Sequence, residues 1–372
     1  MRQSSKRTWG KLHCRRPIVK IKRRILRLLG LAAVSLLLAG CVSSLLAQKM
    51  VKAPNRQGLP PEFKDKKNLA GCDLFYAQSW RTPVGPPTAD LAVAVINPGD
   101  YHLVYDIKET MRPDGGGTFA VKINSKGPES PAELAGNGLL PKATLVLLHG
   151  IITTKETMLP WALFFAEKGY RVVLVDLRGH GRSTGKWIGF GAWEADDLVK
   201  VTDELQRRGL LMGKLGVFGS SYGAAVGIHW AARDPRVATV VALAPFSDPQ
   251  GAIPVFARGF DPHLAGKMSD ATFAAAEIKA AASAGFSWSD VNVLEAMKRV
   301  HVPVLFFHGS RDTWILPANT EALVRVAPVG SRREVTPNDD HLSLMVRFDL
   351  IGPPVLAWFN ERLQDAGSLG LK

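Results

Sequence analysis

The most constraining feature of this sequence is the pentapeptide Gly219-Ser220-Ser221-Tyr222-Gly223, which reads G-x-S-x-G. An apolar stretch at 214–218 precedes it, and small, mostly apolar residues at 224–232 follow it. This order predicts a buried parallel strand, a tight turn, and a helix packed close to a sheet. The turn needs glycines on both sides because side chains would collide there. It would hold the Ser221 hydroxyl out beside a helix N-terminus, which favours negative charge.

A serine nucleophile needs a base to take its proton and a third group to orient that base, and candidates for both follow downstream. Residues 302–309 read as a buried strand, and Asp312 comes just after it, where open α/β sheets place functional groups. His341 closes a polar loop after the last predicted strand and is the candidate base. Asp339 and Asp340 are rival acids, but direct neighbours of a histidine rarely reach back to its ring.

Acyl transfer also needs hydrogen-bond donors for the negative oxygen that develops in the transition state. The backbone amide of Tyr222, next to the nucleophile, is one candidate. The second is expected in the loop after a strand predicted at 143–148, and we assign it to the amide of Ile151. His149 and Gly150 shape that turn, and no chemical role is assigned to His149.

Together these features resemble the α/β-hydrolase superfamily, in its branch of serine esterases, lipases and serine aminopeptidase-like enzymes. Four features carry the resemblance: Leu148-His149-Gly150, the segment 176–183, the G-x-S-x-G turn, and the pair of Asp312 and His341. The likeness spans residues 100–365. It implies an α/β-hydrolase fold: a mostly parallel central sheet with helices on both faces and a cap insertion. Because this scaffold hosts many reactions, the likeness does not choose a substrate.

Apolar and helical stretches alternate through the middle of the chain, which predicts a parallel sheet covered on both faces. The predicted strands are 143–148, 171–176, 214–218 and 237–244, and the predicted helices are 156–168 and 193–208. Residues 246–300 interrupt the alternation and are expected to form a cap with an alanine-rich helix near 271–284. Two or three of its large apolar residues are expected to face the site, with the rest in the cap's own core: Phe246, Phe256, Phe260, Phe273, Phe286 and Trp288.

Neither a metal nor an organic cofactor is expected. Glu194, Asp196 and Asp197 could suggest metal ligands, but they open a predicted helix, where acidic residues favour the positive end of the dipole. The glycines at 115–117 lack the following helix that a phosphate-binding loop requires. A hairpin turn between two early strands is the better interpretation of these glycines.

The amino-terminal segment predicts export. Residues 1–27 hold eleven Lys or Arg and no acidic residue, residues 28–38 are apolar, and Leu38-Ala39-Gly40-Cys41 follows. This order is typical of a secretory signal. Its end resembles a bacterial lipoprotein box, in which Cys41 becomes the lipidated first residue. The uncharged run continues to Gln48, so an uncleaved anchor is the alternative. Both interpretations place the catalytic part at the cell envelope, outside the cytoplasm.

The leader also accounts for the basic balance of the chain. The net charge is +14, but without the eleven leader cations 36 basic residues face 33 acidic ones, leaving +3. A protein this close to neutral has no electrostatic case for nucleic acid. Cysteine use requires no disulfide, since Cys14 belongs to the leader, Cys41 would carry lipid and no other cysteine remains to bond with Cys72. Val42-Ser43 lacks the aspartate associated with inner-membrane retention, which by resemblance favours the outer membrane.

The sequence thus divides into a signal peptide at 1–40, a tether and amino-terminal extension at 41–99, a first core part at 100–245, the cap at 246–300 and a second core part at 301–372. The expected function is cleavage of a small-molecule carboxylic ester by Ser-His-Asp acyl transfer. One alternative is a peptidase or aminopeptidase of the same fold, with Glu277, Asp290 and Glu295 available to bind a free amino terminus. Another is a catalytically inert envelope protein.

Overall fold

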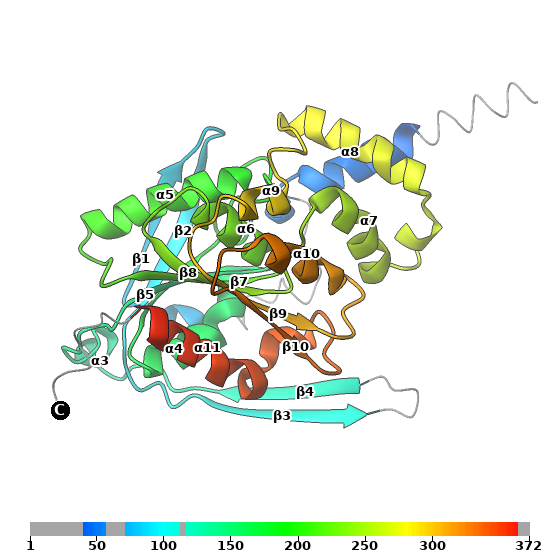
Figure 1. Ribbon diagram of the computed structural model, residues 1–372. Helices are drawn as coiled ribbons and strands as arrows, with labels where there is room; N and C mark the ends of the chain where they lie inside the picture. Colours follow the sequence, from blue (N-terminus) through cyan, green and yellow to red (C-terminus); the bar gives the residue numbers. More distant parts are fainter. Residues whose placement is uncertain (1–39, 57–70, 112–116, 364–372) are drawn as a thin grey trace, which may run out of the picture.

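The structure is a computed structural model that describes residues 40–56, 71–111 and 117–363 (Figure 1). Its centre is an eight-stranded sheet with the order β1-β2-β6-β5-β7-β8-β9-β10. β2 runs antiparallel to β1 and β6, and every other neighbouring pair is parallel. The strands are β1 (Gln78–Val84), β2 (Ala89–Ile96), β5 (Thr144–Leu148), β6 (Arg171–Val175), β7 (Leu215–Ser220), β8 (Val237–Leu243), β9 (Val304–Gly309) and β10 (Arg332–Thr336). The predicted fold class is confirmed.

Helices cover both faces of this sheet, which explains why the central strands are apolar along their whole length. Along β5, Leu145 and Leu147 face one core layer, and Val146 and Leu148 face the other. The first layer is closed by α4 (Leu159–Glu167) and α11 (Phe348–Leu363). The second is closed by α5 (Ala192–Arg207), α6 (Tyr222–Ala231), α9 (Val293–Met297) and α10 (Ala318–Val326). The side chains thus alternate between the layers, as the pleat of a strand requires.

The stretch between β8 and β9 forms a helical lobe at one end of the molecule, at the upper right in Figure 1. It contains α7 (Pro249–Phe260), η5 (Ala265–Lys267) and α8 (Asp270–Ala284). α8 is the predicted alanine-rich helix. It begins at Ser269, whose side chain accepts from the amide of Thr272, and ends at Gly285, whose φ of 83° suits a glycine.

The sheet begins earlier than the predicted core, because β1 and β2 precede residue 100. Residues 40–51 form a helix, and Ser43, Ala47 and Val51 on it are buried. The amide of Ile188 donates to Val51 O at 2.9 Å. Part of the segment expected to be a tether is therefore packed against the body, because its apolar side chains complete a core layer. The division into domains at residue 100 stays a prediction.

A two-stranded antiparallel sheet, β3 (Val104–Met111) and β4 (Gly117–Asn124), extends along the lower edge of the molecule (Figure 1). It is the predicted hairpin, although Gly115 and Gly116 lie outside the described residues. The shorter elements are η1 (Pro54–Arg56), η3 (Cys72–Phe75), α3 (Pro131–Leu134), η4 (Lys155–Met158) and η6 (Ser343–Val346). Residues 1–39 of the predicted signal peptide also lie outside the described residues. Within the described residues, no helix combines the length and apolar character needed to cross a bilayer.

Candidate active site

The candidate nucleophile, Ser221, lies at the turn between β7 and α6. Its backbone has φ 51° and ψ −111°, a conformation that residues with a side chain rarely adopt, and its amide donates to Leu243 O at 2.7 Å. A Cβ added at Gly219 would lie 2.6 Å from the Ala224 Cα, and one at Gly223 would lie 2.6 Å from His149 O. Both flanking positions therefore require glycine, for the steric reason that the motif suggested.

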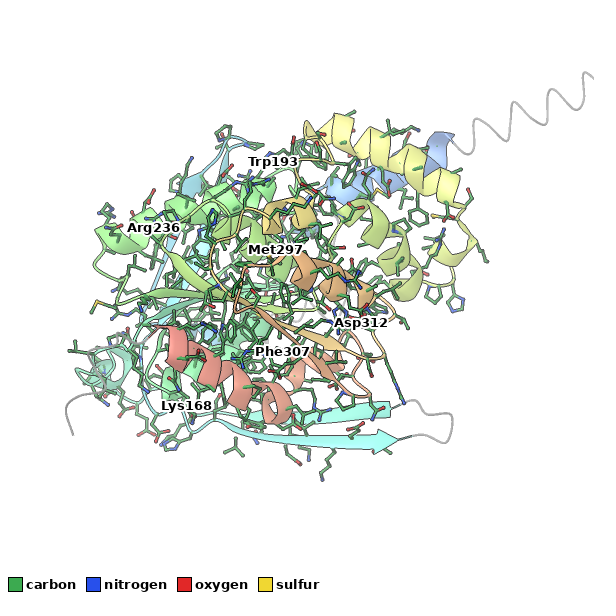
Figure 2. The ribbon with its side chains drawn as sticks, viewed as in Figure 1. Lys168, Trp193, Arg236, Met297, Phe307 and Asp312 are labelled. Atoms are coloured by element: carbon green, nitrogen blue, oxygen red, sulfur yellow. The ribbon has the colours of Figure 1, made fainter. Side chains whose placement is uncertain are left out.

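Three side chains predicted from the sequence form one hydrogen-bonded chain. His341 Nε2 lies 2.9 Å from Ser221 Oγ, and His341 Nδ1 lies 2.7 Å from Asp312 Oδ2. All three are nearly enclosed, with exposures of 7% for Ser221, 6% for His341 and 2% for Asp312. They follow the carboxyl ends of β7, β9 and β10, so the parallel sheet brings them to one edge. Figure 2 shows Asp312 just beyond β9, whose Phe307 lies inside the core.

The Asp312 carboxylate is held on every side. Oδ1 accepts the amides of Trp314 at 2.9 Å and Ile315 at 2.8 Å, and Oδ2 faces the rings of both His341 and His308. Burial alone would raise the pKa of Asp312, but the hydrogen bonds from His308 and His341 outweigh it and lower the pKa to about 2. The carboxylate is therefore ionised at neutral pH. It fixes a proton on His341 Nδ1 and leaves Nε2 free to accept the serine hydroxyl.

His308, the next-to-last residue of β9, is a site residue that the sequence interpretation missed. Its ring is fully buried, with Nε2 at 2.7 Å from Ile315 O and 3.3 Å from Asp312 Oδ2. Nδ1 lies 3.1 Å from Thr320 Oγ1. The ring thus ties the loop that carries the acid to the end of the strand. Its place in a buried-strand pattern gave no signal of this role.

The two predicted oxyanion donors are free to act. Across the described residues, neither the Ile151 amide nor the Tyr222 amide donates to a protein acceptor. The loop of Ile151 lies against the nucleophile, since a Cβ added at Gly150 would be 3.8 Å from the Ser221 Cβ. His149 Nδ1 donates to Gly150 O at 2.8 Å, and its Nε2 accepts the amide of Leu177 at 3.0 Å. Burial lowers the pKa of His149 to about 4, so a neutral ring supports this turn.

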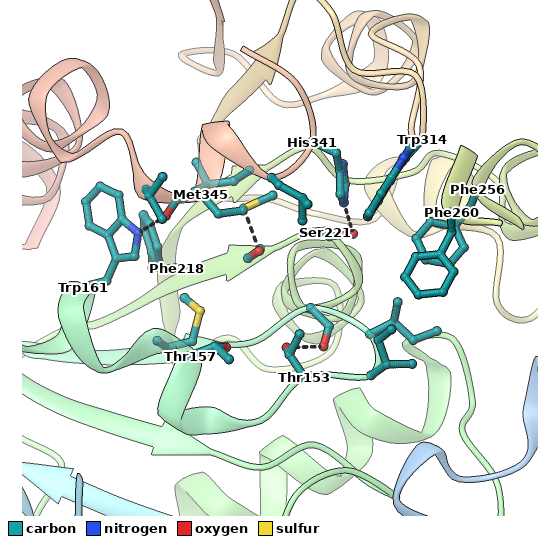
Figure 3. Close-up of a pocket in the computed structure, with 18 residues that line it drawn as sticks. Thr153, Thr157, Trp161, Phe218, Ser221, Phe256, Phe260, Trp314, His341 and Met345 are labelled. Atoms are coloured by element: carbon teal, nitrogen blue, oxygen red, sulfur yellow. Dashed lines mark hydrogen bonds between the residues drawn. The ribbon is translucent and has the colours of Figure 1, made fainter. Parts of the chain in front are cut away.

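A cavity of about 510 Å³ opens at Ser221, and nearly all of its lining is apolar (Figure 3). One end, the inner end, is lined by Thr157, Trp161, Phe218 and Met345 (Figure 3). The other end, the cap end, is lined by Phe256, Phe260 and Trp314. The Trp314 ring lies 5.6 Å from the His341 ring. Ser221 stands between the two ends, so a bound molecule can extend away from it in two directions.

Of the six large apolar residues expected in the cap, two line this cavity: Phe256 and Phe260. The remaining four pack elsewhere: Phe246, Phe273, Phe286 and Trp288. Trp314, which follows the acid rather than belonging to the cap, was not anticipated as a wall. Its ring also contacts Phe256 at a centroid distance of 5.7 Å.

The acidic residues considered as metal ligands have other partners, and those considered for binding an amino terminus lie outside the cavity lining. Glu194 accepts from the Tyr222 hydroxyl at 2.9 Å and from the amides of Gly189 and Gly191, and Asp197 pairs with Arg178. Asp196 pairs with Arg233 at 3.1 Å. None of the described residues that line the cavity is acidic, and three acids named for peptide binding lie outside that lining: Glu277, Asp290 and Glu295.

The segment 176–183, which was one of the four features behind the resemblance, joins loops that lie beside the site. Asp176 is buried and accepts the amides of Lys155 at 2.8 Å and Arg182 at 2.9 Å. The Lys155 ammonium lies 3.3 Å from the same carboxylate. These bonds join the loop after β6 to η4, next to the Ile151 turn, and none reaches the reacting atoms.

Comparisons with known proteins bear on the family and the fold of this chain. A family model described as serine aminopeptidase, S33 (Hydrolase_4), matches residues 140–290. The chain is 27% identical to the uncharacterized protein YqkD of Bacillus subtilis (strain 168) over 189 residues. That match covers 48% of this chain and 58% of YqkD, so the chain spans little more than half of this relative.

Solved structures resemble the fold across most of the chain. A 2,6-dihydroxy-pseudo-oxynicotine hydrolase is similar with a TM-score of 0.51 at 14% identity, covering 77% of this chain and 68% of that one. The esterase Pf2001 of Pyrococcus furiosus is similar with a TM-score of 0.48 at 21% identity, covering 72% of this chain and 98% of that one. At such identities the likeness concerns the fold.

Proposed function

We propose that this chain is a serine hydrolase of the α/β-hydrolase superfamily that cleaves carboxylic esters. One observation carries the proposal: the unbroken hydrogen-bonded series from Ser221 through His341 to Asp312, open to an apolar cavity. Such a series makes a weakly nucleophilic hydroxyl reactive, because its proton has a receiving nitrogen and the developing imidazolium has a carboxylate.

The first half of the reaction forms an acyl-enzyme. Ser221 Oγ attacks the ester carbonyl carbon while its proton passes to His341 Nε2. The carbonyl oxygen becomes an oxyanion, which the amides of Ile151 and Tyr222 stabilise. The tetrahedral intermediate then collapses, the bond to the alcohol oxygen breaks, and His341 gives its proton to the leaving alkoxide.

The second half uses the same groups on water. His341 Nε2 takes a proton from a water molecule as its oxygen attacks the acyl carbon. The oxyanion forms again at the two amides. Collapse breaks the bond to Ser221 Oγ, which recovers its proton from His341, and the carboxylic acid leaves. Asp312 stays ionised throughout because its pKa is about 2.

The lining of the cavity favours an ester over a peptide with a free amino terminus. A protonated amine needs a carboxylate or several acceptors in the site. The described lining residues include no Asp or Glu and are mostly aliphatic or aromatic. An aminopeptidase remains the second candidate, since a family model of that description matches 140–290.

The test is covalent labelling with a fluorophosphonate, followed by an ester and aminoacyl substrate panel. The wild-type chain should become labelled, and Ser221→Ala should not. Ser220→Ala is the matched control because its hydroxyl also lines the cavity but contacts Met345 Sδ instead of a histidine. An inert protein would stay unlabelled, and preference for aminoacyl amides over esters would assign the activity to a peptidase.

We also propose that the enzyme is an envelope lipoprotein carrying lipid on Cys41. The support is the sequence around this residue, which combines a basic leader, an apolar stretch and Leu-Ala-Gly-Cys. In addition, the Cys41 side chain is exposed and unpaired among the described residues. Mass spectrometry of the mature amino terminus tests this, because a chain that still begins at Met1 would favour the uncleaved anchor.

A further inference from the structure

The helix at residues 40–51 joins the amino-terminal attachment point directly to the cap. Lys279, on α8, donates to Ser43 Oγ at 2.7 Å and to Ser44 Oγ at 2.9 Å, and both serines follow Cys41, so these bonds remain when the chain is cleaved before Cys41. Figure 1 shows this helix lying beside α8. At its other end, Val51 is completely buried. Because the helix is bound at both ends, it does not act as a flexible spacer. An anchor attached at Cys41 therefore also keeps the cap near the membrane.

Large apolar side chains are exposed on both sides of this contact. Leu45, one residue past the turn that Lys279 binds, is 70% exposed, and Ile278, one residue before Lys279, is 72% exposed. Val42, Phe260 and Leu264 are also exposed on the same helix and on the α7–η5 part of the cap. We call these five residues the cap face. Single exposed apolar residues are ordinary, but several of them on elements that pack together, one of which leads to the attachment point, indicate a contact surface.

We propose that the cap face lies against the lipid surface of the membrane; this inference rests on the proposed envelope anchoring. The occupant follows from the sequence that enters the helix. An apolar stretch at 28–38 and the exposed Cys41 come immediately before or at its first turn, so an acyl group or an apolar anchor ends there. Because no spacer separates this attachment point from the helix at 40–51, we expect Leu45 and Ile278 to contact the lipid surface. Their contact with it is favoured because it removes apolar area from water.

The same arrangement defines the class of substrate. Phe260 belongs to the cap face and also lines the cavity, whose cap end leads to Ser221. An amphiphilic ester with its chain in the lipid layer therefore reaches the serine along apolar side chains. The products are the same as in water: water adds across the ester bond, releasing a carboxylic acid and an alcohol. The expected substrates are lipid-soluble esters held in the membrane.

The experiment uses the full chain in proteoliposomes and two nitrophenyl esters, one short and water-soluble, the other long and embedded in the vesicles. Leu45→Asp and Ile278→Asp should lower the ratio of embedded-ester to soluble-ester turnover about tenfold. Leu140→Asp and Val329→Asp are matched controls, because both side chains are exposed and apolar. They precede β5 and β10, at the strand ends opposite to Ser221, and their ratio should not change.

The soluble ester reports folding and catalysis in every variant. A normal soluble rate with an unchanged ratio in both cap-face variants would overturn the proposed membrane contact. An equal fall in the ratio for Leu140→Asp and Val329→Asp would overturn it too, since the effect would then be one of charge alone. Absence of turnover of both esters by the wild-type chain would instead contradict the proposed esterase function.

Discussion

The two regions that meet at Ser221 differ in how they are built. The proposed catalytic side chains lie on loops at the ends of β7, β9 and β10, and both oxygens of the Asp312 carboxylate have partners. The cap end of the cavity is made of rings from Phe256, Phe260 and Trp314, which contact one another without hydrogen bonds between them. The hydrogen-bonded geometry is thus found at the edge of the sheet, whereas the aromatic rings determine the shape of the cap end of the cavity. Changes in the first region should remove turnover, and changes in the second should redirect it.

The largest effect is expected from Asp312→Asn. The amide has nearly the same shape but no charge, and it can present a donor to His341 Nδ1, which stabilises the wrong tautomer. Turnover of a soluble ester should fall by about 10⁴-fold. Steady-state kinetics measures it, with Asp340→Asn as the control because that neighbouring carboxylate accepts the amides of Leu342 and Ser343 instead of facing a histidine ring. A loss below tenfold would mean that the acid is elsewhere.

His308→Leu should have an intermediate effect. It removes a ring that faces Asp312 Oδ2 and holds Ile315 O, so kcat/KM should fall by about 10- to 100-fold. Because the hydrogen bond from His308 lowers the pKa of Asp312, its loss should raise that pKa and move the acid limb of the pH profile of kcat/KM to higher pH. His229→Leu, at a buried histidine away from the site, is the control. A loss of activity without this pH shift would indicate a purely structural role.

Smaller effects, on selectivity, are expected from the two ends of the cavity. His341 must protonate the leaving oxygen, and Trp314 packs against its ring, so the leaving alcohol should occupy the cap end. Phe256→Ala should then change the preference among alcohol groups about 3- to 10-fold and leave the acyl preference unaltered.

Thr157→Phe narrows the inner end instead and should disfavour long acyl groups by a similar factor. A panel of esters that varies acyl and alcohol parts independently measures both variants. If Phe256→Ala altered the acyl preference and Thr157→Phe the alcohol preference, the two ends would have to be exchanged.

The smallest effect concerns stability. Because the pKa of Asp312 lies near 2 in the folded protein and near 3.8 when unfolded, its ionised form stabilises the fold above pH 3.8. That contribution, about 2 kcal/mol, is lost as the pH falls toward 2. Urea unfolding of wild type and Asp312→Asn between about pH 5 and 2.5 should show a steeper decline for the wild type. Parallel curves would contradict the low pKa.

The polar half of the site could be anticipated because each member had a local cause. Gly219 and Gly223 mark a turn with no room for side chains, and Asp312 and His341 follow predicted strands whose carboxyl ends must meet in a parallel sheet. The supporting ring of His308 lies inside a strand, where its pattern is indistinguishable from core. Trp314 lines the cavity only because of how its loop folds. The helix at 40–51 is held by contacts with Lys279 and Ile188, which are far from it in the sequence. Neither leaves a periodic signal along the chain.

The order in which the catalytic residues occur has a consequence for biosynthesis. Ser221 leaves the ribosome long before His341, and the histidine is positioned by β10, the last strand of the sheet. A nascent or truncated polypeptide therefore lacks its proton acceptor, whatever the state of its nucleophile. Hydrolytic competence would appear only after β10 and the loop that follows it have been made, so a simple colorimetric assay could double as a reporter of translation and folding past this point.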